Sequence, residues 1–348
     1  MKIGILTLPL HTNYGGILQA FALQSFLKQQ GHDVWLIKRT WNINYITRIK
    51  IFVKHFIKKY ILFQKYDANK FIHRHIKQTT QKYFTSETLQ KYVKNKHFDA
   101  FIVGSDQIWR PKFAGDILYD YFLHFINDQV IKKIAYAASF GEDEWSFSKE
   151  QTTICSKLLQ QFNAVSVREK SGIMLCKNNM GVIAKHVLDP TMLLGKKNYL
   201  LLTKNIKVNG NLFVYNILGS IQENEKIVSI VMKKEHLIPF RMTVNKNNVS
   251  VERWLKSFDV AKFVVTDSFH ACIFSIIFNK PFIVFTNNVE GRTRFVSLLS
   301  EFGLENRLIQ SSEQTESVLN TYIDWSFVNL VLKTKQMESL QFLQNALI

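Results

Sequence analysis

Residues 261–290 contain two short apolar runs joined by one helical stretch, and this order constrains the fold more than any other feature of the chain. The first run, Ala261 to Thr266, is rich in β-branched and aromatic residues, and the second extends from Pro281 to Phe285. Between them, residues 269–278 are apolar enough to form a buried helix. The order strand, helix, strand indicates a parallel α/β unit, in which ligands bind beyond the carboxyl ends of the strands.

The turn between the first run and the helix carries candidate chemistry. Asp267 and Ser268 are good helix N-caps, which places His270 in the first helical turn. Unpaired backbone N–H groups and the positive end of the helix dipole favour an anion at such a position. The alternative is that the two residues only cap the helix and that His270 is a surface residue with satisfied hydrogen bonds.

The same alternation of apolar runs and helical stretches continues along the chain. A length of 348 residues suffices for two domains, and 47% hydrophobic residues can form two cores. A crossover between the domains is expected at residues 193–210. The predicted strands are 2–8, 34–37, 98–103, 134–138, 164–167, 212–217, 237–241, 261–266 and 281–285; the predicted helices are 17–30, 49–63, 67–82, 86–94, 221–233, 251–257, 269–278 and 327–348.

The loop after the first predicted strand is a candidate for binding a phosphate or a sugar. Gly15 and Gly16 let backbone N–H groups approach a ligand closely, while Asn13 and Tyr14 supply hydrogen bonds and a stacking face. The alternative is a tight turn without a ligand. The unit lacks the GxGxxG pattern, so nothing indicates a dinucleotide site.

Two further strands end in residues that suit a binding site. Ser105 and Asp106 follow the strand at 98–103; Asp106 is a candidate hydroxyl acceptor or base, and Trp109 a candidate stacking platform for a sugar. The alternative for Asp106 is an N-cap or an Asx-turn. Arg168 follows the strand at 164–167, where its guanidinium suits a phosphate or carboxylate. Its alternative is a salt bridge with Glu169 or a neighbouring helix.

The net charge of +18 implies an anionic partner, which nucleic acid, acidic lipid and anionic substrate all satisfy. Residues 38–82 hold twelve Lys or Arg and a single acid, Asp67, so this segment alone carries +11. The charge clusters beside an apolar helical stripe and not along an aromatic strand platform, so nucleic acid is not an expected partner.

That stripe lies in residues 49–63, where apolar side chains recur at steps of three and four. Lys50, Lys54 and Lys58 fall on another face. The pattern predicts a basic amphipathic helix. Such a helix either contacts an anionic membrane surface or packs its stripe on the protein core.

Three cysteines at wide spacing, Cys155, Cys176 and Cys272, indicate neither a disulfide framework nor a zinc site. The first ten residues lack a cleavage site and read as a strand, not a signal peptide. No run of about 18 apolar residues predicts a membrane span. The expected location is the cytoplasm, with peripheral contact at the inner face of the plasma membrane as the alternative.

Seven motifs spread over most of the chain together resemble one family. They are NYGGILQAFAL, FDAFIVGSDQIWRP, IAYAASFG, SVREKSG, VLDPT, TDSFH and GRTRF. The run TDSFH, followed by an apolar helix and NKPF, resembles the C-terminal signature of the polysaccharide pyruvyl transferase family. The resemblance implies two Rossmann-like domains in a GT-B-like arrangement with a cleft between them. It also implies transfer of the enolpyruvyl unit of phosphoenolpyruvate onto a sugar, usually as a cyclic ketal.

The resemblance implies roles for the candidate residues. His270 is expected to act as acid or base near the donor and Asp106 at the acceptor. The donor's charges are expected to meet Arg168, Ser268, and Arg292 or Arg294; the acceptor is expected to meet Asn13, Tyr14, Gly15, Gly16, Ser105 and Trp109. Neither a metal nor a cofactor beyond the donor substrate phosphoenolpyruvate is expected.

The chain departs from the family at one motif. Many members carry Arg-Leu-His where this chain has Ser268-Phe269-His270. Either another Arg replaces the missing guanidinium or the donor differs. The alternatives to pyruvyl transfer are therefore a GT-B-type glycosyltransferase that uses a nucleotide sugar, and a saccharide-binding protein without turnover.

The domain boundaries follow from the predicted elements and the resemblance. Residues 1–192 form the first domain, on the acceptor side, with a basic helical insertion at about 43–83. Residues 193–325 form the second, on the donor side, and a final helix at 326–348 is expected to cross back onto the first. The expected acceptor is a cell-surface saccharide or its lipid-linked precursor.

Overall fold

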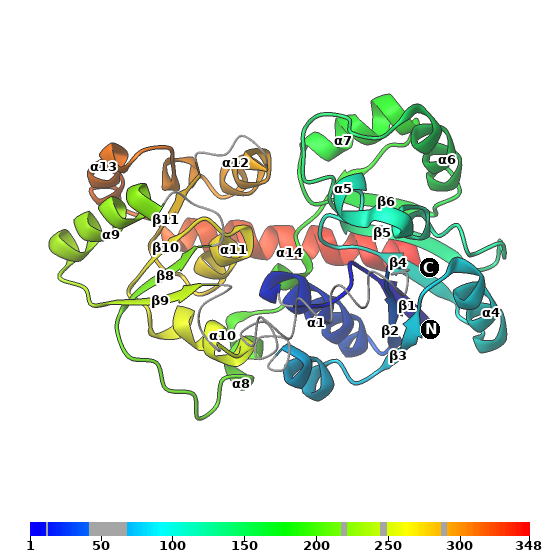
Figure 1. Ribbon diagram of the computed structural model, residues 1–348, viewed down its shortest axis with the longest axis horizontal. Coiled ribbons are helices and arrows are strands. Elements are labelled where there is room, and N and C mark those ends of the chain that lie inside the picture. The colour runs from blue at the N-terminus through cyan, green and yellow to red at the C-terminus, as the bar shows by residue number, and fades with distance from the viewer. Residues whose placement is uncertain (12, 42–67, 217–220, 244–248, 287–290) are drawn as a thin grey trace, which may run out of the picture.

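The computed structural model describes residues 1–11, 13–41, 68–216, 221–243, 249–286 and 291–348. They form two α/β units side by side, each built around one parallel sheet (Figure 1). The predicted fold class is confirmed by these two sheets. The amphipathic helix predicted at 49–63 lies outside the described residues.

The first sheet has seven strands in the order β3-β2-β1-β4-β5-β6-β7, and all neighbours pair in parallel. The chain order reverses between β1 and β4, so the loops that follow these two strands diverge and leave a crevice at the sheet edge. The strands are β1 (Lys2–Leu6), β2 (Asp33–Arg39), β3 (Thr79–Tyr83), β4 (Ala100–Val103), β5 (Lys132–Ala138), β6 (Ala164–Val167) and β7 (Lys185–His186); the helices are α1 (Tyr14–Gln29), α4 (Ser86–Lys96), α5 (Pro111–Ala114), α6 (Lys149–Leu159) and α7 (Ser171–Leu175).

The second sheet has five parallel strands in the order β12-β11-β10-β8-β9. Its central strands carry Val, Ile and Phe on both faces, as expected where helices cover both sides. The strands are β8 (Leu212–Asn216), β9 (Pro239–Thr243), β10 (Phe263–Thr266), β11 (Phe282–Phe285) and β12 (Leu308–Ile309); the helices are α8 (Lys196–Leu201), α9 (Ile221–Glu235), α10 (Val251–Val260), α11 (Phe269–Ile277), α12 (Arg292–Glu301) and α13 (Thr315–Leu319).

Two helices, α1 and α11, meet where the two units face each other (Figure 1). All nine residues of α11 are buried, and so is most of α1. A helix that is apolar around its whole circumference must be covered on every side. Each helix therefore packs against its own sheet and also helps to close the boundary between the units.

The last helix, α14 (Trp325–Leu347), runs along both units (Figure 1). Near its middle, Lys335 pairs with Glu301 of α12 at 2.9 Å. Further on, the Ser339 hydroxyl accepts from the backbone N–H of Leu188 at 3.1 Å, and Phe342 packs on Tyr136 of β5. The helix thus joins the second unit to the core of the first.

Two local predictions are wrong. The helix predicted over 67–82 ends by residue 75, and Thr79–Tyr83 form the edge strand β3, since β-branched Thr79 and Thr80 suit a pleated surface. Helix α1 begins at Tyr14 and not at 17, so Gly15 and Gly16 lie inside its first turn. Among the described residues, no helix is long and apolar enough to cross a bilayer.

Candidate active site

The centre of the site is the contact between Gly15 of α1 and His270 of α11. A Cβ atom built on Gly15 would lie 2.0 Å from the His270 Nδ1 atom, where no real side-chain contact exists. Glycine is therefore required at position 15 by a neighbour from the other unit. This contact brings the first turn of α1, at the end of β1, against the first turn of α11, at the end of β10.

His270 is buried, with 7% of its surface exposed, so its interpretation as a surface residue is wrong. Its Nε2 atom lies 3.6 Å from Oδ2 of Asp189, beyond hydrogen-bond length. No other described group bonds Nε2. A buried imidazole nitrogen without a hydrogen-bond partner, beside a carboxylate, makes His270 a candidate for proton transfer.

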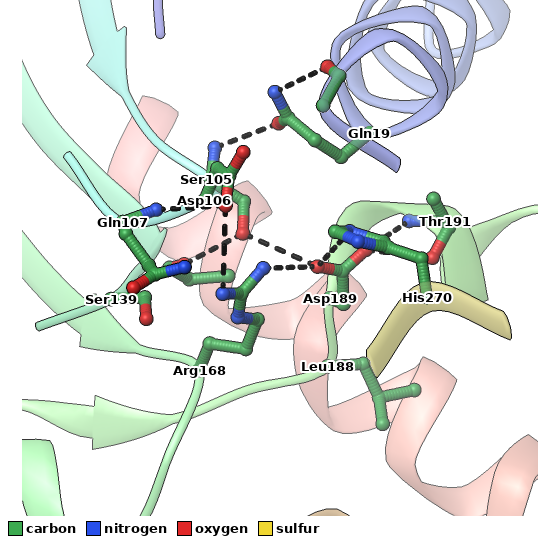
Figure 2. A network of polar contacts seen from close by, with 12 residues as sticks. Gln19, Ser105, Asp106, Gln107, Ser139, Arg168, Leu188, Asp189, Thr191 and His270 are labelled. Atoms are coloured by element: carbon green, nitrogen blue, oxygen red, sulfur yellow. Dashed lines mark hydrogen bonds and ion pairs between the residues drawn. The ribbon is translucent and has the colours of Figure 1, made fainter. Parts of the chain in front are cut away.

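Asp189 joins the site from the segment that closes the first unit (Figure 2). It caps the short 3-10 helix Pro190–Leu193, where its Oδ1 atom accepts from the Thr191 backbone N–H at 2.9 Å and from the Thr191 hydroxyl at 2.6 Å. Its Oδ2 atom accepts from Nη1 of Arg168 at 3.0 Å. Burial acts to raise the pKa of Asp189, but His270 and Arg168 outweigh it and hold the pKa well below its usual range.

Arg168 lies among three carboxylates. Besides Asp189, its guanidinium lies 3.8 Å from Oδ1 of Asp106 and 3.9 Å from Oε2 of Glu169, and it stacks 4.6 Å above the Phe269 ring. Burial opposes the charge, but the carboxylates outweigh it and raise the pKa of Arg168. Arg168 thus forms internal salt bridges, as its alternative interpretation predicted, and its Nε and Nη2 atoms lack hydrogen-bond partners among the described groups.

Arg294 supplies a second guanidinium, 5.4 Å from the Phe269 ring. Burial and the charge of Arg168 lower its pKa to about 10, and its Nε atom has no hydrogen-bond partner in the described structure. Arg292 begins the same helix but lies beside Gln310 instead. Of the two candidates, Arg294 is therefore the one whose charge lies close to Arg168.

Ser268 serves its own helix. Its Oγ atom accepts from the Ala271 backbone N–H at 3.3 Å, and its own N–H donates to Oγ1 of Thr266 at 3.0 Å. The prediction that Ser268 is the N-cap is thus confirmed, and its side chain is buried.

The loop after β4 contributes Asp106, which lies 3.8 Å from Arg168. Ser105 is fully buried: its N–H donates to Oε1 of Gln19 at 2.9 Å, and its hydroxyl donates to the Ala137 carbonyl at 2.8 Å (Figure 2). Ser105 therefore holds the loop in place and is not a contact residue for the acceptor. Asp106, which follows it, adopts a left-handed φ of 68° and accepts from the N–H of Gln107 at 2.9 Å.

A cavity of about 530 Å³ opens beside Asp106, at the crevice between the ends of β1 and β4. Asn13 and Gly16 line it, and a Cβ atom built on Gly16 would lie 3.3 Å from Oδ2 of Asp106. Asn13 also caps α1 by accepting from the Gly16 N–H at 3.2 Å. Of the residues proposed for the acceptor, Asn13, Gly16 and Asp106 are brought together here.

Two aromatic residues proposed for the acceptor lie elsewhere. The prediction for Trp109 as a stacking platform is wrong, because its ring is fully buried against Phe122, with centroids 5.2 Å apart. The prediction for Tyr14 as a stacking face is also wrong: it is buried, and its hydroxyl donates to the Val249 carbonyl of the second unit at 2.5 Å.

The aromatic wall of the cavity is built by residues that the sequence analysis missed. Trp41 follows β2, stacks on His11 at 5.5 Å, and donates its indole N–H to the Ala114 carbonyl. Phe113 lines the same cavity and is 40% exposed. An aromatic residue next to a strand end was the available signal for Trp41. The described residues contain no group of three His, Cys, Asp or Glu side chains placed to hold a metal ion.

Comparison with known proteins identifies a family and a fold. The family model for polysaccharide pyruvyl transferase matches residues 13–289. No match was found among curated proteins. Among solved structures, UDP-GlcNAc 2-epimerase from Methanocaldococcus jannaschii, in complex with UDP-GlcNAc and UDP, matches with a TM-score of 0.52 and 12% identity over 96% of this chain and 99% of that one.

Two other structures are similarly related. UDP-GlcNAc 2-epimerase from Neisseria meningitidis, bound to UDP-GlcNAc, gives a TM-score of 0.55 and 8% identity over 99% of this chain and 100% of that one. UGT73P12 from Glycyrrhiza uralensis, complexed with glycyrrhetinic acid 3-O-monoglucuronide, gives a TM-score of 0.50 and 6% identity over 97% of this chain and 91% of that one. At these identities the likeness shows the fold alone, which is the GT-B arrangement.

Proposed function

Because the chain belongs to the polysaccharide pyruvyl transferase family, we propose that it transfers a pyruvyl group from phosphoenolpyruvate to a pair of hydroxyls on a sugar. The acceptor is a cell-surface saccharide or its lipid-linked precursor. The observation that carries the proposal is the convergence of His270, Arg168 and Arg294 around Asp189 and Phe269. Asp106, 3.8 Å from Arg168, lines the cavity at the ends of β1 and β4.

The proposed reaction needs two substrates and no further cofactor. Both acceptor oxygens bond to the donor's central carbon, the bond from that carbon to the phosphate oxygen breaks, and the methylene becomes a methyl group. Of the two hydroxyl protons, one goes to the methylene carbon and the other leaves with the phosphate. The enzyme must therefore deliver one proton, accept one, and stabilise the departing anion.

His270 is proposed as the acid or base. Its buried Nε2 atom has no hydrogen-bond partner in the described structure, and Asp189 lies 3.6 Å away to stabilise the protonated ring. Because the pKa of Asp189 is held low, this carboxylate stays charged while His270 exchanges its proton. Asp189 acts as a positioning residue and not as the acid.

Arg168 and Arg294 are proposed to bind the donor. Nε and Nη2 of Arg168 and Nε of Arg294 lack hydrogen bonds in the described structure, and the two guanidinium groups lie around the Phe269 ring. Phosphoenolpyruvate carries a phosphate and a carboxylate, which suit two guanidinium groups. In this arrangement Arg294 replaces the guanidinium that many members of the family carry at the position of Ser268.

The cavity beside Asp106 is proposed to hold the acceptor sugar. Asp106 and Asn13 supply hydrogen-bond acceptors and donors for its hydroxyls, and Trp41 and Phe113 offer apolar faces. Asp106 is proposed to accept a hydroxyl proton. If the acceptor is lipid-linked, contact of residues 49–63 with an anionic membrane would place the enzyme where that acceptor is held.

A second candidate is a glycosyltransferase that uses a nucleotide sugar. It is favoured by Ser268 in the family's Arg position and by the fold shared with proteins solved with UDP or UDP-GlcNAc. Both candidates are tested by incubating the protein with phosphoenolpyruvate or with a panel of nucleotide sugars. Phosphate release and a mass gain on the saccharide from phosphoenolpyruvate alone are expected. Turnover of a nucleotide sugar without turnover of phosphoenolpyruvate would replace the proposal with this second candidate.

The role of His270 is tested by His270→Ala, with His124→Ala as the control, since His124 is exposed and outside the site. Loss of a general acid or base is expected to lower kcat about 100-fold or more, while the control keeps its rate. Equal rates for the two variants would remove His270 from the mechanism.

A further inference from the structure

A second cavity, of about 320 Å³, lies next to the proposed acceptor cavity. It is bounded by the ends of β1, β2 and β3 and by the helical residues 68–75. The segment Leu8 to His11 lines both cavities. Since His11 also stacks on Trp41, a ligand whose sugar ring lies beside Trp41 reaches the second cavity by passing His11.

The second cavity is basic. Lys38, Lys82 and His73 line it, and no carboxylate does so among the described residues. Arg39 also lines it, but its guanidinium is paired with Asp120 at 2.5 Å. The cavity therefore carries positive charge that no described side chain of the wall neutralises.

The two lysines are direct neighbours. Lys38 of β2 and Lys82 of β3 are register partners on adjacent parallel strands. Like charges in this position repel each other and destabilise the pair. Burial, and then the charge of Lys82, lower the pKa of Lys38. An anion bound between the two ammonium groups would remove this repulsion.

We propose that this second cavity binds a diphosphate group at the reducing end of the acceptor saccharide. The inference rests on the proposed function, since it assumes that the sugar itself lies in the first cavity. Backbones of adjacent strands are about 4.8 Å apart, so the two lysines suit an anion that presents charge at two points. Saccharides with such a group occur on a lipid carrier and on a nucleoside, and the chemistry that the cavity recognises is shared.

The binding site is tested first without any reaction, with inorganic pyrophosphate as the probe. Calorimetry at constant ionic strength and saturating phosphoenolpyruvate keeps the probe from Arg168 and Arg294. Wild-type protein is expected to bind pyrophosphate under these conditions, and the double variant Lys38→Gln/Lys82→Gln about tenfold more weakly or worse. The matched control Lys91→Gln/Lys94→Gln removes two exposed lysines of α4 and is expected to bind as wild type does. Equal affinity of the three proteins, or no binding, would overturn the proposal.

The second test compares one saccharide in three forms: free, linked to a polyprenyl diphosphate, and linked to a nucleoside diphosphate. At least one linked form is expected to have a KM about tenfold below that of the free sugar, and the Lys38→Gln/Lys82→Gln variant is expected to lose this advantage while its KM for phosphoenolpyruvate is unchanged. Preference for the polyprenyl form identifies the lipid as the source, and preference for the other form identifies the nucleoside. An equal KM for free and linked forms would refute the proposal. Failure to use phosphoenolpyruvate at all refutes the proposed function instead, and the pyrophosphate measurement still decides the site.

Discussion

The substitution Gly15→Ala tests the contact on which the site depends. The new Cβ atom would lie 2.0 Å from Nδ1 of His270, whereas ordinary contacts begin near 3.4 Å, so helix α1 and the ring must separate by about 1.4 Å. Overpacking of this kind costs about 1–3 kcal/mol, while Ala in place of Gly in a helix contributes up to about 1 kcal/mol in the opposite direction. We therefore expect a net loss of stability.

A double-mutant cycle isolates the clash. In a His270→Ala background the ring is absent, so adding Gly15→Ala is expected to be neutral or stabilising. The coupling energy between the two positions is then about 1–3 kcal/mol, measured as free energies of unfolding in urea. Gly16→Ala is the matched control, because its new Cβ atom would lie 3.3 Å from Oδ2 of Asp106, a much milder contact than the 2.0 Å at position 15.

The same substitution is expected to lower kcat. A displacement near 1 Å at a catalytic group costs about 100-fold in rate, so Gly15→Ala is expected to fold and yet turn over about 100-fold more slowly. Additive effects of the two substitutions on stability, within about 0.5 kcal/mol, would refute the described contact. A Gly15→Ala protein as active as wild type would refute its role in positioning His270.

Three other outcomes are expected. The pKa of Asp189 is depressed in the folded protein, so the charged carboxylate stabilises the fold above its unfolded pKa of about 3.9, and this stabilisation is lost as the pH falls below that value. In urea melts, the stability advantage of wild type over Asp189→Asn should therefore shrink between pH 5 and about pH 3. A constant difference would contradict this. Trp109→Ala should lose about 3–5 kcal/mol of stability, because the ring is fully buried. Trp41→Ala should chiefly raise the KM for the acceptor, because Trp41 lines the cavity. The reverse pattern in unfolding and kinetic assays would contradict the assignment of the cavity. Wild-type protein should sediment with acidic but not neutral vesicles, and changing Lys50, Lys54 and Lys58 together to Gln should release it. Equal sedimentation of both proteins on acidic vesicles would exclude membrane docking through residues 49–63.

Local sequence patterns predicted the units of the fold because each unit is specified by neighbours in the chain. The apolar run before Asp267 is sufficient to predict β10, and the N-cap at Ser268 with the apolar stretch that follows is sufficient to predict α11. The edge strand β3 was missed because its exposed face is polar and its residues continue a helical pattern from the preceding segment. Tertiary pairing with β2, which the pattern does not contain, decides its conformation.

The chemistry of the site depends on contacts between distant segments, and there the sequence was a weaker guide. Asp189 was not singled out, because its partners Arg168 and His270 lie 21 and 81 positions away and only the folded chain brings them together. Trp109 and Trp41 are both aromatic residues that follow a strand end, yet Trp109 packs in the core and Trp41 lines a cavity. Burial of this kind is set by the elements that cover a side chain and not by its own segment.

Helix α14 gives the first unit an unusual order of assembly. Phe342, Leu343, Ala346 and Leu347 belong to the same buried cluster as Ile3 and Ile5 of β1, although the whole second unit is translated between them. A nascent chain that has just finished β7 therefore presents an apolar surface that its own later residues must cover. The first unit cannot complete its core on the ribosome ahead of the second, in contrast to the usual domain-by-domain order. Pairing segments this far apart raises the contact order of the fold, so we expect the docking of α14 to be a late step of folding.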